Sequence, residues 1–346
     1  MNFYKEQHKF YCGIDLHARK MYLCILDEKG EVKLHRNMDT DREVFLKAIE
    51  PYREDVVVAV ECMFAWYWIA DLCQKENIPF VLGHALYMKA IHGGKAKNDK
   101  IDSQKIAVLL RGGMIPQSYV YPEKMRATRD LMRRRNHLMR KRAELLAHIQ
   151  NTNSQYNLDE TFGTIAVPSR RGDIVGSFND PSVKKSMEVN LRVIETYDAA
   201  LDDLKKTILK LAQYHDPVSY ALLDSIYGIG KIGALTILYE IEDIRRFPRV
   251  QDFVSYARLV KCAHESNGKK YGNGGSKIGN AHLKWAFSEA AVLFLRGNEP
   301  GKKYYERLTR KHGKGKALSI LAHKLGRAVY FILKNKEAFD MQKFLR

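Results

Sequence analysis

Short apolar runs alternate with helix-like stretches along the first sixty residues. Apolar runs predict strands over 10–16 and 21–26, and alternating polarity predicts a third strand over 31–36. Helical spacing of the apolar positions indicates a helix over 41–52. The unbroken β-branched run over 55–60 is typical of a strand buried at the centre of a sheet.

The same alternation continues to about residue 122. We expect a helix rich in aromatic residues over 64–75, a strand over 79–83 and a helix that begins near Asp99. Three consecutive strands followed by alternating helices and strands is the order of the ribonuclease-H-like fold. Other mixed α/β domains share this order. The sequence therefore predicts an α/β N-terminal domain over 1–122, with the ribonuclease-H-like fold as the leading interpretation.

Long helices are expected over 123–215, which we interpret as a helical coiled-coil connector. An apolar stripe follows the helix that begins at Lys124, and a second one follows a helix predicted over 183–213. The two helices are expected to pack either as a hairpin or across a dimer. Between them, residues 153–181 are rich in Gly, Pro, Ser and Asn without periodicity and predict an irregular connection.

The remaining residues, 216–346, predict a mainly α C-terminal domain. A glycine-rich turn over 227–233 precedes the apolar run 234–241. Glycines permit a tight turn and expose backbone N–H groups at a helix start, as in helix-hairpin-helix elements that hold a DNA phosphate; a plain helix turn is the alternative. A basic amphipathic helix is predicted over 311–336. The candidate phosphate contacts of the turn are Gly228, Gly230 and Lys231.

The net charge of the chain indicates what kind of partner it binds. The 346 residues include 58 Lys and Arg against 40 Asp and Glu, a net charge of +18. Such a surplus favours a polyanionic partner, and nucleic acid is the leading one. No apolar run reaches the roughly 18 to 20 residues of a membrane span. Five cysteines without a CxxC pair suggest neither a disulfide framework nor a thiolate zinc site. We expect a soluble, cytosolic nucleic-acid-binding protein.

The positive charge is concentrated in the helix that begins at Lys124. Between Lys124 and Arg142 nine residues are Lys or Arg and only Asp130 is acidic. The alternative is an ordinary solvated helix face, but so steep an imbalance favours nucleic-acid contact. The candidate contacts are Arg129, Arg133, Arg134, Arg135, Arg140, Lys141 and Arg142.

Four carboxylates mark the ends of predicted elements in the N-terminal domain. Asp15 ends the first strand, Glu61 ends the β-branched strand, and Asp99 and Asp102 share one helix face through their i, i+3 spacing. If the strands are neighbours, the four acids converge and repel one another unless a hard cation such as Mg²⁺ or Mn²⁺ compensates them. Two such ions would clamp a phosphate. For each acid taken singly, a surface carboxylate or a helix cap is the alternative.

These segments resemble a known family. The stretches around Asp15, around Glu61 and over 97–102 are similar, in order and spacing, to the RuvC-like domain of DEDD-type insertion-sequence transposases, which are described as bridge-RNA-guided serine recombinases. Residues 226–234 and 314–317 resemble the C-terminal part of that family. The resemblance covers nearly the whole chain apart from the connector. It implies that Asp15, Glu61, Asp99 and Asp102 are catalytic metal ligands.

The resemblance also assigns a nucleophile. The family's catalytic serine falls at Ser266, ahead of a basic loop that includes Ser276 and Lys277. From the residues alone, Ser266 and Ser276 are equal candidates, and a serine in a Gly/Asn-rich loop usually only forms a turn. A serine hydroxyl needs a base or a metal to become nucleophilic, and His264 is one candidate base. Ser276, Lys277, Lys314 and Lys316 are further candidate nucleic-acid contacts.

Taken together, the resemblance implies an enzyme that cuts and rejoins DNA through a serine–DNA phosphoester with Mg²⁺ or Mn²⁺ as cofactor. It implies donor and target DNA and a non-coding bridge RNA as partners, a homo-oligomer (dimer or tetramer), and a place in the bacterial or archaeal cytosol near the nucleoid. The alternatives are a site-specific invertase of the same family, a RuvC-like junction nuclease that uses water, and a non-catalytic RNA-binding scaffold.

Overall fold

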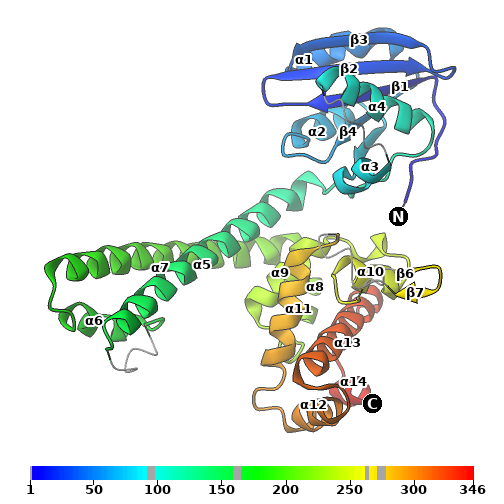
Figure 1. Cartoon of the computed structure of the whole chain (residues 1–346). Coiled ribbons are helices and arrows are strands. Elements are labelled where there is room, and N and C mark those ends of the chain that lie inside the picture. Colours follow the sequence, from blue (N-terminus) through cyan, green and yellow to red (C-terminus); the bar gives the residue numbers. More distant parts are fainter. Residues whose placement is uncertain (1, 92–97, 159–164, 262–264, 271–277) are drawn as a thin grey trace. The chain divides into compact units, whose positions relative to one another are not determined.

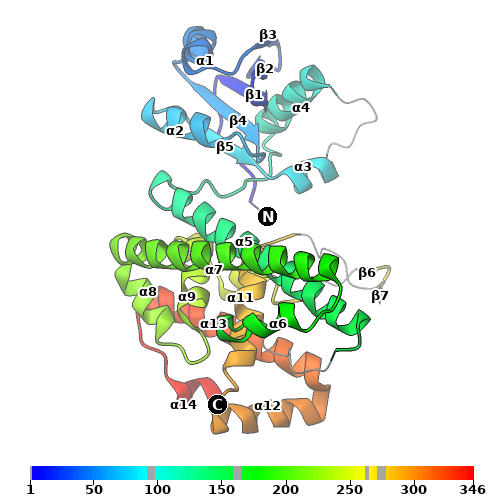
Figure 2. The ribbon, with the colours of Figure 1, turned by 90° about the vertical axis from the view of Figure 1, so that its left-hand side faces the viewer.

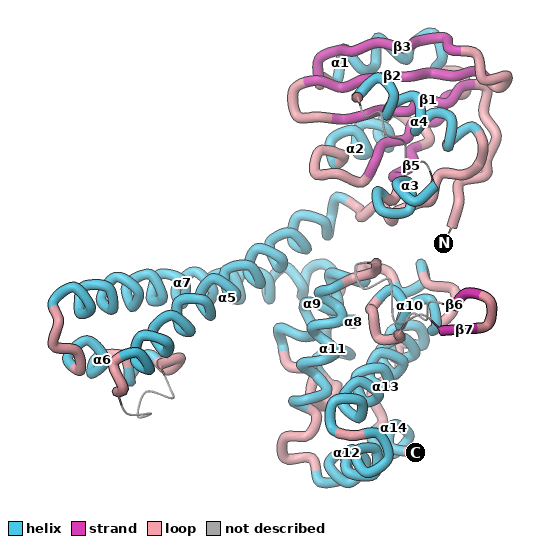
Figure 3. The backbone as a smooth tube through the Cα atoms, viewed as in Figure 1, coloured by secondary structure: helices cyan, strands magenta, loops and turns pink. Residues whose placement is uncertain are grey.

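The chain divides into two compact units, Met1–Glu123 and Lys124–Arg346, which are described separately (Figure 1). The computed structural model describes residues 2–91, 98–158, 165–261, 265–270 and 278–346. The long strands occur in the first unit, and the second is mainly helical (Figure 3). Within the described part of the chain, no helix is long and apolar enough to cross a membrane.

A five-stranded mixed sheet forms the centre of the first unit, with strand order β3-β2-β1-β4-β5. The central strand β1 pairs antiparallel with β2 and parallel with β4, and β4 pairs parallel with β5. This mixed α/β sheet is consistent with the expected ribonuclease-H-like fold, and the five predicted strands are confirmed with shifted ends. The strands are β1 (Phe10–Leu16), β2 (Lys20–Asp27), β3 (Val32–Asp39), β4 (Val56–Glu61) and β5 (Phe80–Gly83).

Helices cover both faces of this sheet (Figure 2). Residues of α1 (Arg42–Ile49) and α2 (Tyr67–Lys75) share a buried cluster with Ile14 and Val60. On the other face, α4 (Asp99–Arg111) packs Ile106, Leu109 and Leu110 against Tyr11, Val57 and Ala59. A short helix, α3 (Ala85–Ile91), was not predicted, and the 3-10 turn η1 (Glu50–Tyr52) follows α1.

Two long helices, α5 (Glu123–Gln155) and α7 (Pro181–His215), begin the second unit. They pack as a hairpin within one chain, because α5 contributes Ile149 and α7 contributes Leu191 and Ile194 to one buried cluster (Figure 1). This decides between the two packing modes that the sequence left open. The connection predicted to be irregular holds two short helical pieces, η3 (Pro168–Arg170) and α6 (Gly172–Gly176).

The rest of the second unit is a helical bundle around α9, whose residues 234–241 are all buried and mostly apolar, with Glu240 as the charged residue among them. Phe253, Phe287 and Tyr330 from three other helices pack in the same core. The basic C-terminal helix, predicted over 311–336, begins after Gly313. The elements are α8 (Pro217–Asp224), α9 (Lys231–Ile241), η4 (Ile244–Arg246), α10 (Val250–Tyr256), β6 (Glu265–Ser266), β7 (Lys269–Lys270), α11 (Ala281–Leu293), α12 (Glu299–His312), α13 (Lys314–Asn335) and α14 (Met341–Leu345).

Candidate functional site

Asp15 and Glu61 stand at the same edge of the sheet, on neighbouring parallel strands. Ile14 of β1 pairs with Val60 of β4, so Asp15 and Glu61 occupy the next position on each strand. Ile14 and Val60 are buried on the face that α1 and α2 cover. Because side chains alternate along a strand, Asp15 and Glu61 belong to the opposite face, against which α4 packs.

Helix α4 approaches β1 closely because residue 13 is a glycine. A Cβ atom at Gly13 would overlap the backbone of Ser103 and of Ala107 in α4. Helix α4 therefore packs directly against the backbone of β1 at Gly13, two residues before Asp15. It begins at Asp99 because the Asn98 side chain accepts a hydrogen bond from the Ile101 backbone N–H at 2.8 Å. The close packing at Gly13 directs the first turn of α4 towards the end of β1.

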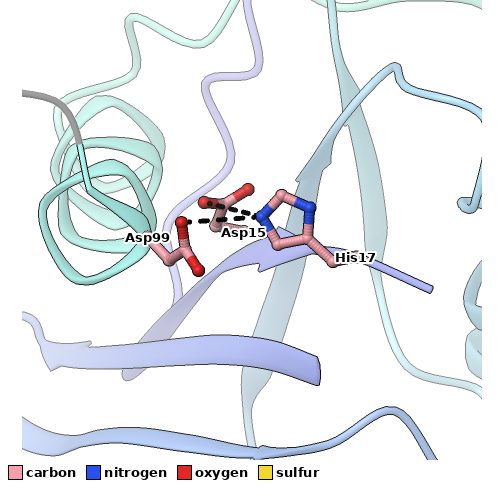
Figure 4. A group of neighbouring side chains, drawn as sticks. All are labelled: Asp15, His17 and Asp99. Atoms are coloured by element: carbon pink, nitrogen blue, oxygen red, sulfur yellow. Dashed lines mark ion pairs between the residues drawn. The ribbon is translucent and has the colours of Figure 1, made fainter. Parts of the chain in front are cut away.

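Asp15, His17 and Asp99 form a compact cluster (Figure 4). One ligand atom from each lies within 4.8 Å of the others. The His17 Nε2 atom is 3.5 Å from a carboxylate oxygen of Asp15 and 3.6 Å from one of Asp99. Burial raises the pKa of Asp15, His17 lowers it, and the nearby charges of Asp99 and Asp102 raise it. The net shift of the Asp15 pKa is upward, and burial is its largest cause.

Asp102 and Glu61 lie outside this three-residue cluster. Asp102 sits in the first turn of α4 with Asp99, and one of its carboxylate oxygens accepts from Lys105 Nζ at 3.2 Å. Carboxylate oxygens suit a hard divalent cation, so Asp15 and Asp99 fit Mg²⁺ or Mn²⁺, whereas an imidazole such as that of His17 is not a typical ligand of Mg²⁺. Sequence analysis missed His17. Its position two residues after Asp15, next to the end of the same strand, was the available signal.

Ser266 lies in a small hairpin of the second unit. Its strand β6 pairs antiparallel with β7, and Ser266 stands opposite Lys269. Asn267 and Gly268 between them have φ of 49° and 71°, the left-handed backbone of a tight two-residue turn. Ser266 thus directly precedes the tip of the hairpin, and its catalytic role stays a prediction. His264, Ser276 and Lys277 lie outside the described residues.

Several arginines of the basic helix bind carboxylates inside the protein. Arg129 is 8% exposed, and its Nε lies 3.1 Å from Glu240 Oε2. Arg133 also binds Glu240, with Nε 2.6 Å from Oε1. Arg142 donates to Asp198 of α7. The expectation that Arg129 contacts phosphate is therefore corrected, because its guanidinium is buried against Glu240.

Other basic residues of α5 remain on the surface. Arg134, Arg140 and Lys141 are exposed, whereas Arg135 is half-buried, and burial lowers its pKa. At the start of α13, Lys314 and Lys316 are exposed too. Helix α12 presents further exposed basic residues that sequence analysis did not single out. They are Lys303, Arg307, Arg310 and Lys311.

The glycine-rich turn between α8 and α9 has two distinct glycines. Gly228 has φ of 87°, and a Cβ there would lie 2.7 Å from the Phe294 backbone, so this glycine permits close packing of the turn against the end of α11. Gly230 is the N-cap of α9 and has open space around its Cα, and the following Lys231 is exposed. Gly230 and Lys231 suit a phosphate contact better than Gly228 does. The helix-hairpin-helix interpretation stays a prediction.

Comparison with known proteins covers both units. A family model described as Transposase, of the DEDD type in the IS110 group, matches residues 12–158. A second, described as Transposase IS116/IS110/IS902 family, matches residues 220–306. The chain is also similar to the transposase for insertion sequence element IS1111A of Coxiella burnetii (strain RSA 493 / Nine Mile phase I), with 23% identity over 334 residues, 94% of this chain and 90% of that relative.

The first match extends past the boundary of the first unit to the end of α5, and the second lies within the helical bundle of the second unit. The first includes the sheet, Asp15, Glu61 and α4, and the second includes the glycine-rich turn and the Ser266 hairpin. An insertion-sequence relative aligns across nearly the whole length. This chain therefore belongs to the IS110/IS116 family of insertion-sequence transposases and carries that family's DEDD-type domain.

Proposed function

We propose that this transposase cuts and rejoins DNA with the acidic cluster as a divalent-metal centre and with Ser266 as the nucleophile. The metal centre is supported by one observation. Asp15 of β1 and Asp99 of α4 each place a carboxylate oxygen close enough to the other for one cation to bind both. Asp102 in the same turn of α4 and Glu61 on the adjacent strand complete the carboxylate set.

Mg²⁺ or Mn²⁺ bound there would polarise the scissile phosphate and stabilise the charge that develops on it. Asp15 and Asp99 would hold the ion, because their oxygens already face one another around His17. Asp102, in the same turn of α4 as Asp99, accepts a hydrogen bond from Lys105 Nζ and would supply another oxygen donor. Glu61 supplies a further oxygen donor from the neighbouring strand. Burial and the charges of Asp99 and Asp102 raise the pKa of Asp15, and a bound cation would favour its ionised form.

Ser266 completes the proposed reaction. Its hydroxyl oxygen bonds to the DNA phosphorus as the bond from phosphorus to the bridging oxygen of the cleaved strand breaks, and the serine proton passes through solvent to that oxygen, which leaves as a hydroxyl. The hydroxyl of the partner strand then attacks the same phosphorus and releases the serine. Each step exchanges one phosphoester for another, so no ATP is needed. The family resemblance supports this role, as does the place of Ser266 next to the tip of a hairpin.

Donor and target DNA are the proposed substrates, with a non-coding bridge RNA that selects them by base pairing. The net charge of +18 and the exposed basic residues of α5, α12 and α13 support phosphate contacts, which are largely indifferent to sequence. Because recombination joins two duplexes, we propose a symmetric homo-oligomer. The invertase alternative would use the same residues on a different arrangement of sites.

The decisive experiment is adduct trapping with DNA substrates that prevent rejoining. Wild-type protein is expected to yield a protein–DNA adduct that survives denaturation, and mass spectrometry should find the nucleotide on Ser266. Ser266→Ala should form none, while Ser276→Ala still forms it. A nucleotide on Ser276 would move the nucleophile, and cleaved ends without any adduct would favour a nuclease that uses water.

A competition assay tests the RNA part of the proposal. Structured RNA from the flank of the element should displace labelled duplex DNA of random sequence at equal length and equal salt. Tighter binding of the random duplex would contradict RNA guidance and leave the metal centre and Ser266 untouched. Cleavage of a labelled junction that depends on Mg²⁺ would exclude a non-catalytic scaffold.

A further inference from the structure

We infer that Glu240 positions the segment that carries Ser266 by tying its end to the basic helix α5. The inference rests on the proposed function, because it takes Ser266 as the nucleophile. The chain leaves α10 at Tyr256, passes through β6 and β7, and enters α11 after Asn280. We call residues 257–280 the serine segment.

The two ends of the serine segment are fastened to each other. The Asn280 backbone N–H donates to the Tyr256 carbonyl at 2.6 Å, and Arg258 Nε donates to the Ile278 carbonyl at 2.9 Å. A Cβ at Gly279 would lie 2.6 Å from the Tyr256 carbonyl oxygen, so only glycine permits this approach. The ends therefore form a closed stem, and whatever fixes Asn280 fixes the stem.

Asn280 joins this stem to Glu240. Its amide nitrogen Nδ2 donates to Glu240 Oε2 at 2.7 Å. Its Oδ1 caps α11 by accepting from the backbone N–H groups of His282 at 2.9 Å and Leu283 at 3.0 Å. Asn280 is 6% exposed and Glu240 2% exposed, so water competes little for these bonds.

Glu240 in turn binds α5. Arg133 donates twice, Nε to Oε1 at 2.6 Å and Nη2 to Oε2 at 2.9 Å, and Arg129 Nε lies 3.1 Å from Oε2. Burial by itself would raise the pKa of Glu240, but Arg133, Arg129 and Asn280 outweigh burial and hold it at about 2. The carboxylate is ionised at neutral pH and joins α5, α9 and the cap of α11.

The chemistry of this junction indicates a positioning role. Well-packed apolar residues often replace a buried ion pair without loss of stability, so stability alone does not explain a charged group here. The junction links two features of the proposed reaction. Arg134 and Arg140, exposed on the same helix as Arg133, are proposed phosphate contacts, and the stem closes the segment of the chain to which Ser266 belongs. Glu240 thus acts on strand transfer through Asn280, without touching the substrate.

Asn280→Ser in the full-length protein removes this link, together with the 3.3 Å hydrogen bond from Asn280 Nδ2 to the Tyr256 hydroxyl. Serine still caps a helix, and Glu240 keeps both arginines, so the fold should survive. The rate of Ser266–DNA adduct formation at saturating DNA should fall on the order of 10- to 100-fold, with the concentration of DNA needed for half-saturation unchanged. Glu240→Gln should lower the same rate, and adduct formation at the wild-type rate in both variants would overturn the inference.

Asn298→Ser is the matched control. Asn298 caps α12 by accepting from the Gly301 N–H at 3.0 Å and is also 6% exposed. Among the described residues its Nδ2 has no hydrogen-bond partner, so it has no link like that between Asn280 and Glu240. This variant should form the adduct at the wild-type rate. If Asn280→Ser and Asn298→Ser slow adduct formation equally, the cause is a general loss of stability, and the positioning role is overturned.

Amide hydrogen exchange gives a readout that does not depend on the nucleophile. Exchange at the backbone amides of Arg258, Asn280 and Leu283 should be faster in Asn280→Ser than in wild type, and unchanged in Asn298→Ser. Unaltered exchange in Asn280→Ser would overturn the tie between Glu240 and the stem. If wild-type protein forms no adduct on Ser266, the proposed function fails, whereas this exchange comparison still decides whether Glu240 holds the stem.

Discussion

Each unit of the chain holds a carboxylate that is at least partly buried, but the pKa of Glu240 in the second unit is lowered and that of Asp15 in the first unit is raised. Glu240 is almost fully buried, yet two arginines and one amide hold its pKa at about 2. Asp15 is less buried, yet burial and the charges of Asp99 and Asp102 leave its pKa raised despite His17. A carboxylate that is neutralised from within supports the fold. Asp15, half-buried beside two further carboxylates and with its pKa raised, is the acid that we propose as a metal ligand.

The largest effect is expected from Asp15→Asn. Strand transfer should fall by more than about 100-fold, since loss of a ligand affects a metal centre at least as much as loss of a group that supports one. Without divalent metal the melting temperature should rise, because a repulsive charge is removed. Strand-transfer assays and thermal melts with and without Mg²⁺ measure both. Asp39→Asn, at an exposed ion pair with Lys20, is the control, and normal activity of Asp15→Asn would refute the metal centre.

Glu240→Gln should lower stability as well as the rate of adduct formation. The free energy of unfolding should fall by about 3 kcal/mol, because Arg129 and Arg133 keep their charges in a buried place without the compensating carboxylate. Urea unfolding of the full chain measures it. Asp198→Asn provides the comparison, since Asp198 also accepts from two arginines, Arg142 and Arg171, but is more exposed. Equal losses in the two variants would show that burial of Glu240 adds nothing.

Acid should distinguish the two carboxylates as well. The pKa of Glu240 is lowered from 4.5 to about 2, so its contribution is complete above pH 4.5 and is lost as the pH falls towards 2. The linked free energy is about 3 kcal/mol. Asp15, with its pKa raised, takes up its proton at a higher pH, and its repulsion is then relieved. Between pH 5 and pH 3 the unfolding free energy should fall less in Glu240→Gln than in wild type, and parallel curves would contradict this assignment.

The smallest expected effect is on the salt dependence of nucleic-acid binding, which should differ between arginines that bind acids inside the protein and those that face solvent. Replacing Arg134, Arg140 and Lys141 by Gln should reduce the slope of log affinity against log salt by about 0.7 to 0.9 for each phosphate that the variant no longer binds. Arg129→Gln should leave the slope unchanged, since its guanidinium is buried against Glu240. Filter binding across a salt series tests both, and a reduced slope in Arg129→Gln would return it to the phosphate-binding surface.

Local patterns in the sequence predicted the sheet and the place of the acids. Apolar runs define the strands, and an acid at the end of such a run, as at Asp15, faces the edge of the sheet. The partner of a charged residue was not predictable in the same way. Arg129 and Glu240 are 111 residues apart, so the pair cannot be recognised from a local pattern. Counting the positive charges of a helix also does not distinguish a buried arginine from an exposed one. Helix α3 is only seven residues long, too short for a helical period to show.

The packing of α4 directly on the main chain at Gly13 limits how this site can evolve. At most positions a slightly larger side chain is accommodated by small shifts of the neighbouring element. Position 13 is different, because even one methyl group would overlap the α4 backbone at two places. The spacing between Asp15 and Asp99 therefore depends on glycine at position 13. Adaptation to another metal would have to proceed through the donors themselves, and the exposed His17 is the position with the most freedom to change.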